Sequence, residues 1–311
     1  MRFFLIWIFW PFFISDSTGY WGFYAHALIN RLAVFSLPEE MIGFYKPQIQ
    51  YITENAVNPD RRRYAVKGEA EKHFIDLDFY GDSALQILPK YWNEAVEKLT
   101  EDSLRANGIG PWSAYFTFLN LTKAFESKNS AAILRLSADL GHYIGDLNVP
   151  LHTTVNYNGQ LTDQIGIHGF WESRVPELQA KDYPLWVGQA EYVEKPQLAL
   201  WDAVAEAHGK VDSVLMVERE LTQNFSPDRK YSYEERNNLT VRVYSREFTE
   251  AYALALNGQI ERQMKKSIKM IADFWFTAWV NAGQPDLSVF PKKTLEEEII
   301  IPDAKIKVRD H

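Results

Sequence analysis

The sequence predicts an all-α protein that folds as a single-domain helical bundle. Apolar residues recur at three- and four-residue spacing through most of the chain after residue 20, which is the pattern of amphipathic helices. Sustained alternation of apolar and polar residues between turn signals is not evident, so we predict no strands. The chain has 311 residues and no internal repeat or Gly/Ser-rich linker, which favours one large domain. Striped helices bury their apolar faces by packing against one another in a bundle.

The predicted helices follow one another closely along the chain. In one of them, Ile133, Leu136 and Leu140 form an apolar stripe. Pro150 is expected to end that helix, and the Asn- and Gly-containing segment Thr153–Gly166 is predicted to be a loop. The predicted helices cover residues 22–35, 84–103, 112–127, 130–147, 166–178, 188–223 and 243–282. The segment 284–311 is predicted to be an irregular tail, to which we assign no function.

The composition restricts the classes of function. Hydrophobic residues make up 46% of the chain and aromatic residues 14%, so a large core can form. A net charge of −8 argues against a basic surface that binds duplex DNA without regard to sequence. It does not exclude a nucleic-acid substrate, because bound metal ions would add local positive charge. The chain has no cysteine, so no disulfide framework exists.

The N-terminus is expected to be a secretory signal peptide. Met1 and Arg2 precede the apolar run FFLIWIFWPFFI, which a polar SDSTG stretch follows. The run is short for a bilayer span, and Pro11 interrupts it. We therefore predict a signal over residues 1–20 and a secreted or periplasmic protein; an uncleaved membrane anchor is the alternative.

A group of histidines and carboxylates is the strongest functional signal. The pattern His142-x3-Asp146-x5-His152 is followed by His168-x3-Glu172, and these three histidines are among only seven in the chain. If the backbone is helical, residues four apart lie on the same face, as helix-borne metal ligands do. Imidazole and carboxylate groups without cysteine suit zinc in a hydrolytic site.

Other candidate ligands lie upstream. Asp60 lies in NPDRRRY, His73 lies in EKHFIDLD, and Trp21 and His26 lie at the presumed start of the mature chain. Taken singly, each histidine could instead be a core residue with satisfied hydrogen bonds. The joint spacing favours metal binding for the set.

These motifs, with Trp21, resemble the zinc-dependent phospholipase C and S1/P1 nuclease superfamily, over roughly residues 21–283. The resemblance implies an all-α secreted phosphodiesterase that holds three zinc ions in a cleft. It also implies that a metal-activated hydroxide attacks phosphorus in line, with Asp60 and Asp146 as catalytic metal ligands. Arg63 would contact the phosphate; a solvated surface run over Arg61–Arg63 is the alternative.

The resemblance also distributes the candidate ligands over three ions. One zinc would be bound by Asp60, His73, His142 and Asp146, and a second by His152, His168 and Glu172. The third would be bound by Asp146 as a bridge, by His26, and by the amino and carbonyl groups of Trp21. That amine is free only if the signal is cleaved just before Trp21; cleavage after Gly19 would leave Tyr20 in the way.

The nuclease and phospholipase branches of the superfamily differ in sequence features, and this chain has features that resemble each branch. The spacing from Trp21 to His26 and the pair Asp60 and Arg63 resemble the nucleases, whereas Glu172 resembles the phospholipases. The short gap between the second and third histidines of the motif is also closer to the phospholipases.

In the nucleases, the residues at Phe74 and Asp76 face the nucleobase, by stacking and by accepting a hydrogen bond. The alternative is that Phe74 is a core residue. We therefore predict a hydrolase that acts on single-stranded nucleic acid or nucleotides and needs no stable protein partner. Phospholipase C-like cleavage of phospholipid head groups is the alternative, and a non-catalytic zinc-binding protein is the second alternative.

Overall fold

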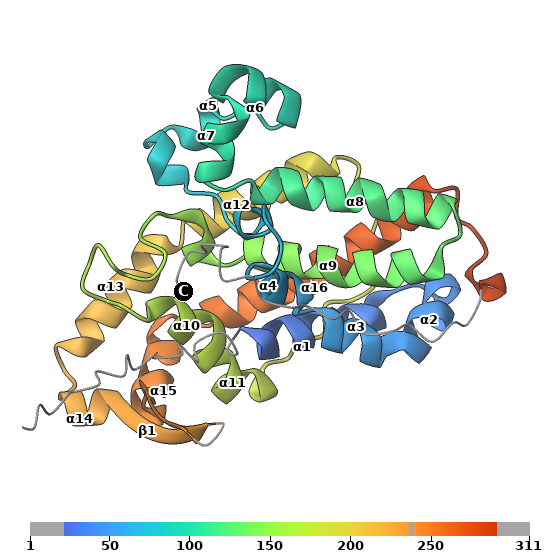
Figure 1. The fold of residues 1–311 in the computed structure, drawn as a ribbon. Coiled ribbons are helices and arrows are strands. Elements are labelled where there is room, and N and C mark those ends of the chain that lie inside the picture. The colour runs from blue at the N-terminus through green and yellow to red at the C-terminus, as the bar shows by residue number, and fades with distance from the viewer. Residues whose placement is uncertain (1–21, 237–238, 291–311) are drawn as a thin grey trace, which may run out of the picture.

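The computed structural model describes residues 22–236 and 239–290 (Figure 1). Over these residues the prediction of a mostly helical single domain is confirmed. The predicted signal segment, Trp21 and the tail from residue 291 lie outside the described residues. Among the helices that are described, none combines the length and the apolar character needed to cross a membrane.

Four helices form the core of the bundle. They are α1 (Phe23–Ala33), α8 (Gly110–Glu126), α9 (Ser130–Leu147) and α16 (Gln259–Asn281). Helices α8, α9 and α16 pack on one another, and α1 packs against both α9 and α16 (Figure 1). The side chain of Asn129 caps α9 by accepting a hydrogen bond from the Ala132 amide at 3.1 Å. Large aromatic side chains, including Trp112 and Trp275, are fully buried between these helices.

Shorter elements surround the core. The N-terminal half contains η2 (Val34–Ser36), α2 (Glu39–Tyr45), η3 (Lys46–Gln48), α3 (Ile49–Asn55), α4 (Asn58–Arg62), η4 (Ala70–Lys72), η5 (Leu77–Tyr80), α5 (Ala84–Ile87), α6 (Trp92–Leu99) and α7 (Glu101–Ala106). The C-terminal half contains η6 (Pro150–Thr153), α10 (Ile167–Gly169), η7 (Phe170–Arg174), α11 (Val175–Gln179), η8 (Ala180–Asp182), α12 (Pro196–His208), α13 (Val211–Thr222), α14 (Pro227–Lys230), β1 (Tyr231–Arg236), β2 (Leu239–Tyr244), α15 (Arg246–Ala255) and η9 (Leu287–Val289).

The long predicted helices are found, but several are divided. The helices predicted over 112–127 and 130–147 correspond to α8 and α9 within two residues at each end. The helix predicted over 84–103 is three short helices, separated at Pro89 and at Thr100, whose φ of 65° lies outside the helical region. The helix predicted over 188–223 begins only at Pro196 and is divided into α12 and α13. Helices α2, α3 and α4 were not predicted.

A β-hairpin contradicts the expectation that the chain has no strands. Strands β1 and β2 pair in antiparallel register, with Tyr231 opposite Tyr244 and Arg236 opposite Leu239. The second strand does alternate, because Leu239, Val241 and Val243 are separated by Thr240 and Arg242. This alternation covers only one strand. It is too short to be distinguished in the sequence from the helical spacing of apolar residues that follows it in α15.

Candidate metal centre

The C-terminal half of α9 carries the two ligand candidates that the other groups surround. His142 and Asp146 lie one helical turn apart, and His142 Nε2 is 3.2 Å from Asp146 Oδ2. Both side chains are buried, at 0% and 1% exposure. The predicted i,i+4 pair therefore lies on one face of a helix, turned into the protein.

The first group of potential ligands joins α9 to two upstream segments. Asp60 lies in α4 and His73 follows η4. His73 Nδ1 lies 2.9 Å from Asp146 Oδ2 and 3.1 Å from His142 Nε2. The Asp60 Oδ1 atom is 3.7 Å from the same His73 and His142 nitrogens. Asp60, His73 and His142 thus converge closely enough to share one metal ion.

The second group brackets the predicted loop, with His152 just before it and His168 and Glu172 after it. His168 Nε2 is 2.7 Å from Glu172 Oε2, and His152 Nε2 is 3.1 Å from His168 Nε2. The helix predicted over 166–178 is not regular here, because Phe170–Arg174 forms a π-helical turn between α10 and α11. Such turns often occur at functional sites. His152, His168 and Glu172 form a buried set that can hold a metal ion.

His26 of α1 lies between these two groups. Its Nε2 atom is 3.3 Å from Asp146 Oδ1 and 3.3 Å from Glu172 Oε1. His26, His142 and Asp146 make a third buried set of potential ligands. Trp21 lies outside the described residues, but the next residue adjoins this set: a Cβ on Gly22 would lie 3.9 Å from His26 Cδ2 and 2.9 Å from Oε1 of Glu172 in the second group. The chain therefore enters the described fold directly at the third group.

Backbone carbonyl groups fix the orientation of three of these imidazoles. The Nδ1 atom of His142 donates to Ala56 O at 2.8 Å, that of His152 to His73 O at 2.5 Å, and that of His168 to Tyr157 O at 3.1 Å. A carbonyl can only accept, so Nδ1 carries a proton, and in the neutral ring the Nε2 lone pair faces the ligand group. This arrangement is typical of metal-binding histidines, and imidazole and carboxylate donors fit zinc.

The carboxylates at the centre are held ionised. Burial alone would raise the pKa of Asp146, but the nearby His142 and His152, with hydrogen bonds from His142 and His26, hold that pKa well below its usual value. Burial likewise opposes ionisation of Glu172, whereas hydrogen bonds from His152, His168 and His26 keep its pKa well below the ordinary range. Both groups are therefore available as anionic ligands at neutral pH.

The pKa values of the imidazoles are shifted in different directions. Burial would lower the pKa of His26, but hydrogen bonds to Asp146 and Glu172 raise it well above the usual value. Burial also opposes protonation of His152, whose pKa is nevertheless raised by Asp146 and Glu172. In His73 burial prevails and lowers the pKa. Without metal, protons on His26 and His152 thus balance the two carboxylates.

Metal binding is therefore expected to release protons. A metal ion needs the neutral imidazole, and raised pKa values keep His26 and His152 protonated to higher pH than an ordinary histidine. Apparent zinc affinity should rise with pH through that range and fall as the pH is lowered. Titration of the metal-free protein with zinc in weakly buffered solution, with a pH indicator, measures the release. Equal affinity at pH 6 and pH 8, within about threefold, would contradict this expectation.

A second prediction concerns His168. His168→Ala is expected to lose the metal held by the second group and to keep the fold, because the ring bonds to other ligand candidates and to the loop residue Tyr157. Elemental analysis of the purified variant measures the metal content, and circular dichroism checks the helix content. Full metal content together with the full hydrolytic rate would show that His168 is not a ligand.

The predicted substrate-contacting residues lie next to this centre in differing environments. Arg63 directly follows α4, is 6% exposed and places Nη1 3.2 Å from Asp60 Oδ1. Phe74 is 8% exposed, and a Cβ on Gly108 (φ 88°) would lie 2.5 Å from its ring, so the ring packs tightly against Gly108. Asp76 is also buried, and its amide donates to Asn107 O at 2.8 Å.

A buried ionic network supports the centre from behind and was not predicted. Arg62 of α4 places Nη2 2.9 Å from Asp139 of α9 and Nε 3.5 Å from Glu69, which also accepts a hydrogen bond from the Tyr143 hydroxyl. These contacts join the segment that carries Asp60 to the helix that carries Asp146. The available signal was Asp139, a charged residue within an otherwise apolar stretch of α9.

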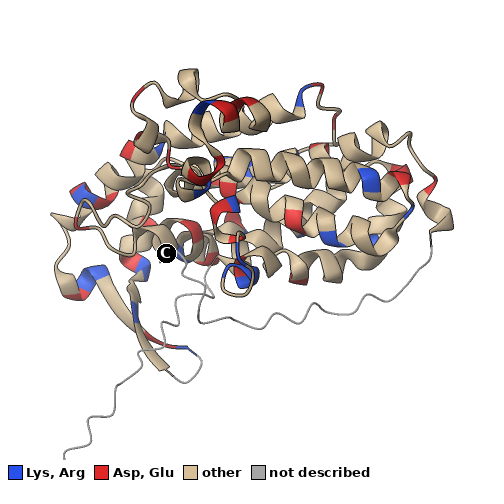
Figure 2. Cartoon of the chain, turned by 45° about the horizontal axis from the view of Figure 1, so that its top comes forward, with Lys and Arg blue, Asp and Glu red and all other residues tan. Residues whose placement is uncertain are grey.

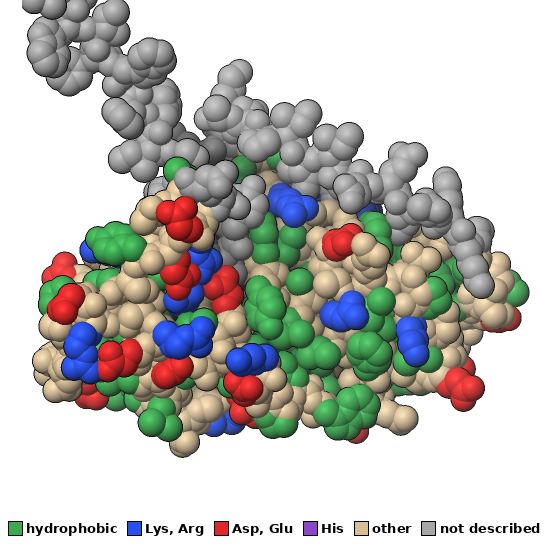
Figure 3. All heavy atoms as spheres, turned by 90° about the horizontal axis from the view of Figure 1, so that it is seen from below, with side chains coloured by type: hydrophobic (Ala, Val, Ile, Leu, Met, Phe, Trp, Pro, Cys, Tyr) green, Lys and Arg blue, Asp and Glu red, His purple; other side chains and the backbone are tan. Residues whose placement is uncertain are grey.

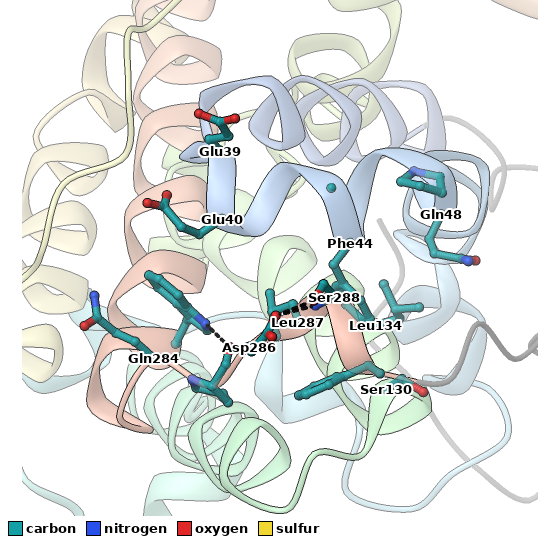
Figure 4. Close-up of a pocket in the computed structure, with 15 residues that line it drawn as sticks. Glu39, Glu40, Phe44, Gln48, Ser130, Leu134, Gln284, Asp286, Leu287 and Ser288 are labelled. Atoms are coloured by element: carbon teal, nitrogen blue, oxygen red, sulfur yellow. Dashed lines mark hydrogen bonds between the residues drawn. The ribbon is translucent and has the colours of Figure 1, made fainter.

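A cavity of about 660 Å³ lies away from the metal centre. Glu39, Glu40 and Phe44 of α2 and Leu134 of α9 line it, together with the segment from Gln284 to Ser288 (Figure 4). Leu134 lies in the first half of α9, whereas the ligand candidates lie in the second half. The cavity therefore belongs to the opposite end of the bundle.

Comparisons with known proteins add a fold match at low identity. No family model and no curated protein matches the sequence. Among solved structures, the chain matches the crystal structure of Clostridium perfringens alpha-toxin isolated from avian strain SWCP, with a TM-score of 0.45 and 12% sequence identity. The match covers 87% of this chain and 66% of the toxin chain, so this chain spans slightly less than two thirds of it.

Proposed function

We propose that the protein is a zinc-dependent hydrolase of phosphoester bonds, of the phospholipase C and S1/P1 nuclease type. The observation that carries the proposal is the convergence of three His/Asp/Glu groups, buried except for the partly exposed Asp60, on the Asp146 carboxylate. One oxygen of Asp146 faces His73 and His142, and the other faces His26 at 3.3 Å. Such sharing is what a multinuclear metal site requires, since the ions of a two-metal site lie about 3.5–4 Å apart.

The side chains around the centre would each serve the reaction. Zinc, when bound, lowers the pKa of water to about 7 and stabilises charge on phosphate oxygens. Asp60 and Asp146 supply the negative charge that retains the cations. Arg63, beside Asp60, would hold a phosphate oxygen with its planar fork of donors. The imidazoles are buried, which would keep bulk water away from the metal ions where protein surrounds them.

For the substrate, the features of the fold favour phospholipid over nucleic acid. Large apolar side chains are exposed on the segments that carry the ligand candidates: Phe79, at 57%, follows His73, and Leu161 and Ile165 lie between His152 and His168. Exposed apolar side chains of this kind suit contact with a lipid surface. Lys and Arg are interspersed with Asp and Glu over the elements seen in Figure 2, without a continuous basic stripe. The packing of Phe74 against Gly108 leaves little ring surface for base stacking.

Single-stranded nucleic acid is the second candidate. The observation that favours it is Arg63 beside Asp60, the pair that resembles the nuclease branch. Phosphate recognition alone serves both substrates, so it does not separate them.

A substrate panel tests the proposal. The zinc-loaded protein is incubated in parallel with phosphatidylcholine and phosphatidylethanolamine vesicles and with single-stranded DNA and RNA. We expect diacylglycerol and phosphorylated head group from the vesicles; 5′-nucleotides instead would favour the second candidate. Asp146→Asn is the matched control for contaminating hydrolases. Zinc binding without turnover of any of these substrates would contradict the proposal and favour a non-catalytic zinc-binding protein.

A further inference from the structure

A small cavity lies beside His26. Its volume is about 30 Å³, and its lining includes residues of α1, α9 and the segment after it, the π-helical turn, α11 and α16. Ile260 and Met264 form apolar walls, Glu172 and Ser267 also line it, and three further polar residues, His26, Asn148 and Gln263, complete the polar lining. A space of this size holds one water molecule but no larger ligand.

Each of the three polar residues has an atom without a hydrogen bond among the described residues. These atoms are His26 Nδ1, Asn148 Oδ1 and Gln263 Oε1. The residues are nearly fully buried, with exposures of 3%, 1% and 2% respectively. On the single face drawn in Figure 3, no histidine side chain is visible among the coloured residues. Buried polar atoms without partners are costly, and buried water commonly satisfies them.

Hydrogen bonds from the amide nitrogens determine which way the two amides point. Asn148 Nδ2 donates to Ile144 O at 2.8 Å, and Gln263 Nε2 donates to Asn148 O at 2.7 Å. The amide oxygens are therefore the atoms that remain, and both are acceptors. His26 Nδ1 is a donor whenever Nε2 presents its lone pair to a metal ion.

We propose that the cavity binds one ordered water molecule, which joins His26 Nδ1 to the side-chain oxygens of Asn148 and Gln263. The hydrogen-bond count closes: the water accepts from Nδ1–H and donates one hydrogen to each amide oxygen. The water then accepts from Nδ1 of His26 as backbone carbonyls do from Nδ1 of His142, His152 and His168.

The hydrogen bond from Nδ1 to the water holds the His26 ring so that Nε2 faces Asp146 and Glu172, at 3.3 Å from each. The presence of the water does not depend on the proposed function; its effect on metal binding rests on His26 being a ligand.

A high-resolution crystal structure of the full chain, solved with and without zinc, tests the water directly. We expect one solvent peak in both structures, within about 3.2 Å of His26 Nδ1, Asn148 Oδ1 and Gln263 Oε1. A cavity without a peak, or a peak that contacts only one of these atoms, would overturn the proposal. This outcome is separate from the proposed function, since the solvent peak requires no turnover.

A variant tests the effect on metal binding. Gln263→Met keeps the side-chain volume and removes the acceptor, so we expect the metal at His26 to bind about 10- to 100-fold more weakly, with the second group unaffected. Ser267→Ala is the control: Ser267 lines the same cavity, but its hydroxyl donates to Gln263 O. Chelator competition measures the affinities, and circular dichroism checks folding. Equal weakening by both variants, or none by Gln263→Met, would overturn the role given to the water.

Discussion

Replacement of Asp146 by Asn is expected to reduce phosphoester hydrolysis by at least about a thousandfold and to remove at least about one metal ion per chain. Both oxygens of this side chain face potential ligands: Oδ2 lies 2.9 Å from His73 Nδ1, and Oδ1 lies 3.3 Å from His26 Nε2. Asparagine keeps the shape but has one oxygen and an NH₂ group that cannot bind a metal. Whichever way the amide turns, one side loses a ligand and the bridging negative charge is lost.

The matched control for this prediction is Asp139→Asn. It makes the same chemical change in the same helix, and Asp139 is also buried, but it pairs with Arg62 rather than with a ligand candidate. We expect the control to lose about 1–3 kcal/mol of stability and to keep its metal content. Elemental analysis and the hydrolytic rate are measured on both variants. Wild-type metal content and rate in Asp146→Asn would show that Asp146 is not the shared ligand.

The parts of the candidate site that could be predicted are the pairs of residues that lie close together in the sequence at helical spacing. His142 and Asp146 are four residues apart in a long amphipathic helix, and helical periodicity places such a pair on one face. His168 and Glu172 have the same spacing and are also in contact, even though their segment includes a π-helical turn rather than a regular helix. The contact tolerates this change because a longer turn still brings the two side chains to the same side.

The other residues of the candidate site are brought together by tertiary contacts, which are difficult to predict from the sequence. His26 and Asp146 are far apart in the chain, and only the packing of α1 against α9 brings them together. The carbonyl partners of the imidazoles, such as Ala56 O, have no signal at all, because any residue supplies a carbonyl. Helices α2, α3 and α4 were not predicted because each is too short to display a full apolar stripe.

Removal of the metal ions is expected to lower the thermal unfolding temperature by about 10 °C or more. Each site that binds only the native state, at a metal concentration about a thousand times its dissociation constant, adds about 4 kcal/mol of stability. Each kcal/mol corresponds to about 2–4 °C in proteins of 150–250 residues, and somewhat less in a longer chain. Several such sites in one domain therefore give a large change in the unfolding temperature. This holds even when ion pairs in the metal-free centre restore part of the lost stability.

The ion pairs between His26 and the two carboxylates also determine how this change in unfolding temperature depends on pH. Below the raised pKa of His26, a proton on that ring replaces part of the charge of the missing metal, so the metal-free protein loses less stability there. As the pH rises through that pKa, the proton leaves and Asp146 and Glu172 face each other across a neutral ring, while metal binding strengthens. The difference in unfolding temperature between zinc-loaded and chelator-treated protein should therefore widen from pH 6 to pH 8 in scanning calorimetry.

Asp146→Asn should show a much smaller difference at either pH. Identical unfolding temperatures with and without chelator in the unmodified protein would mean that the buried groups do not hold metal in the native state.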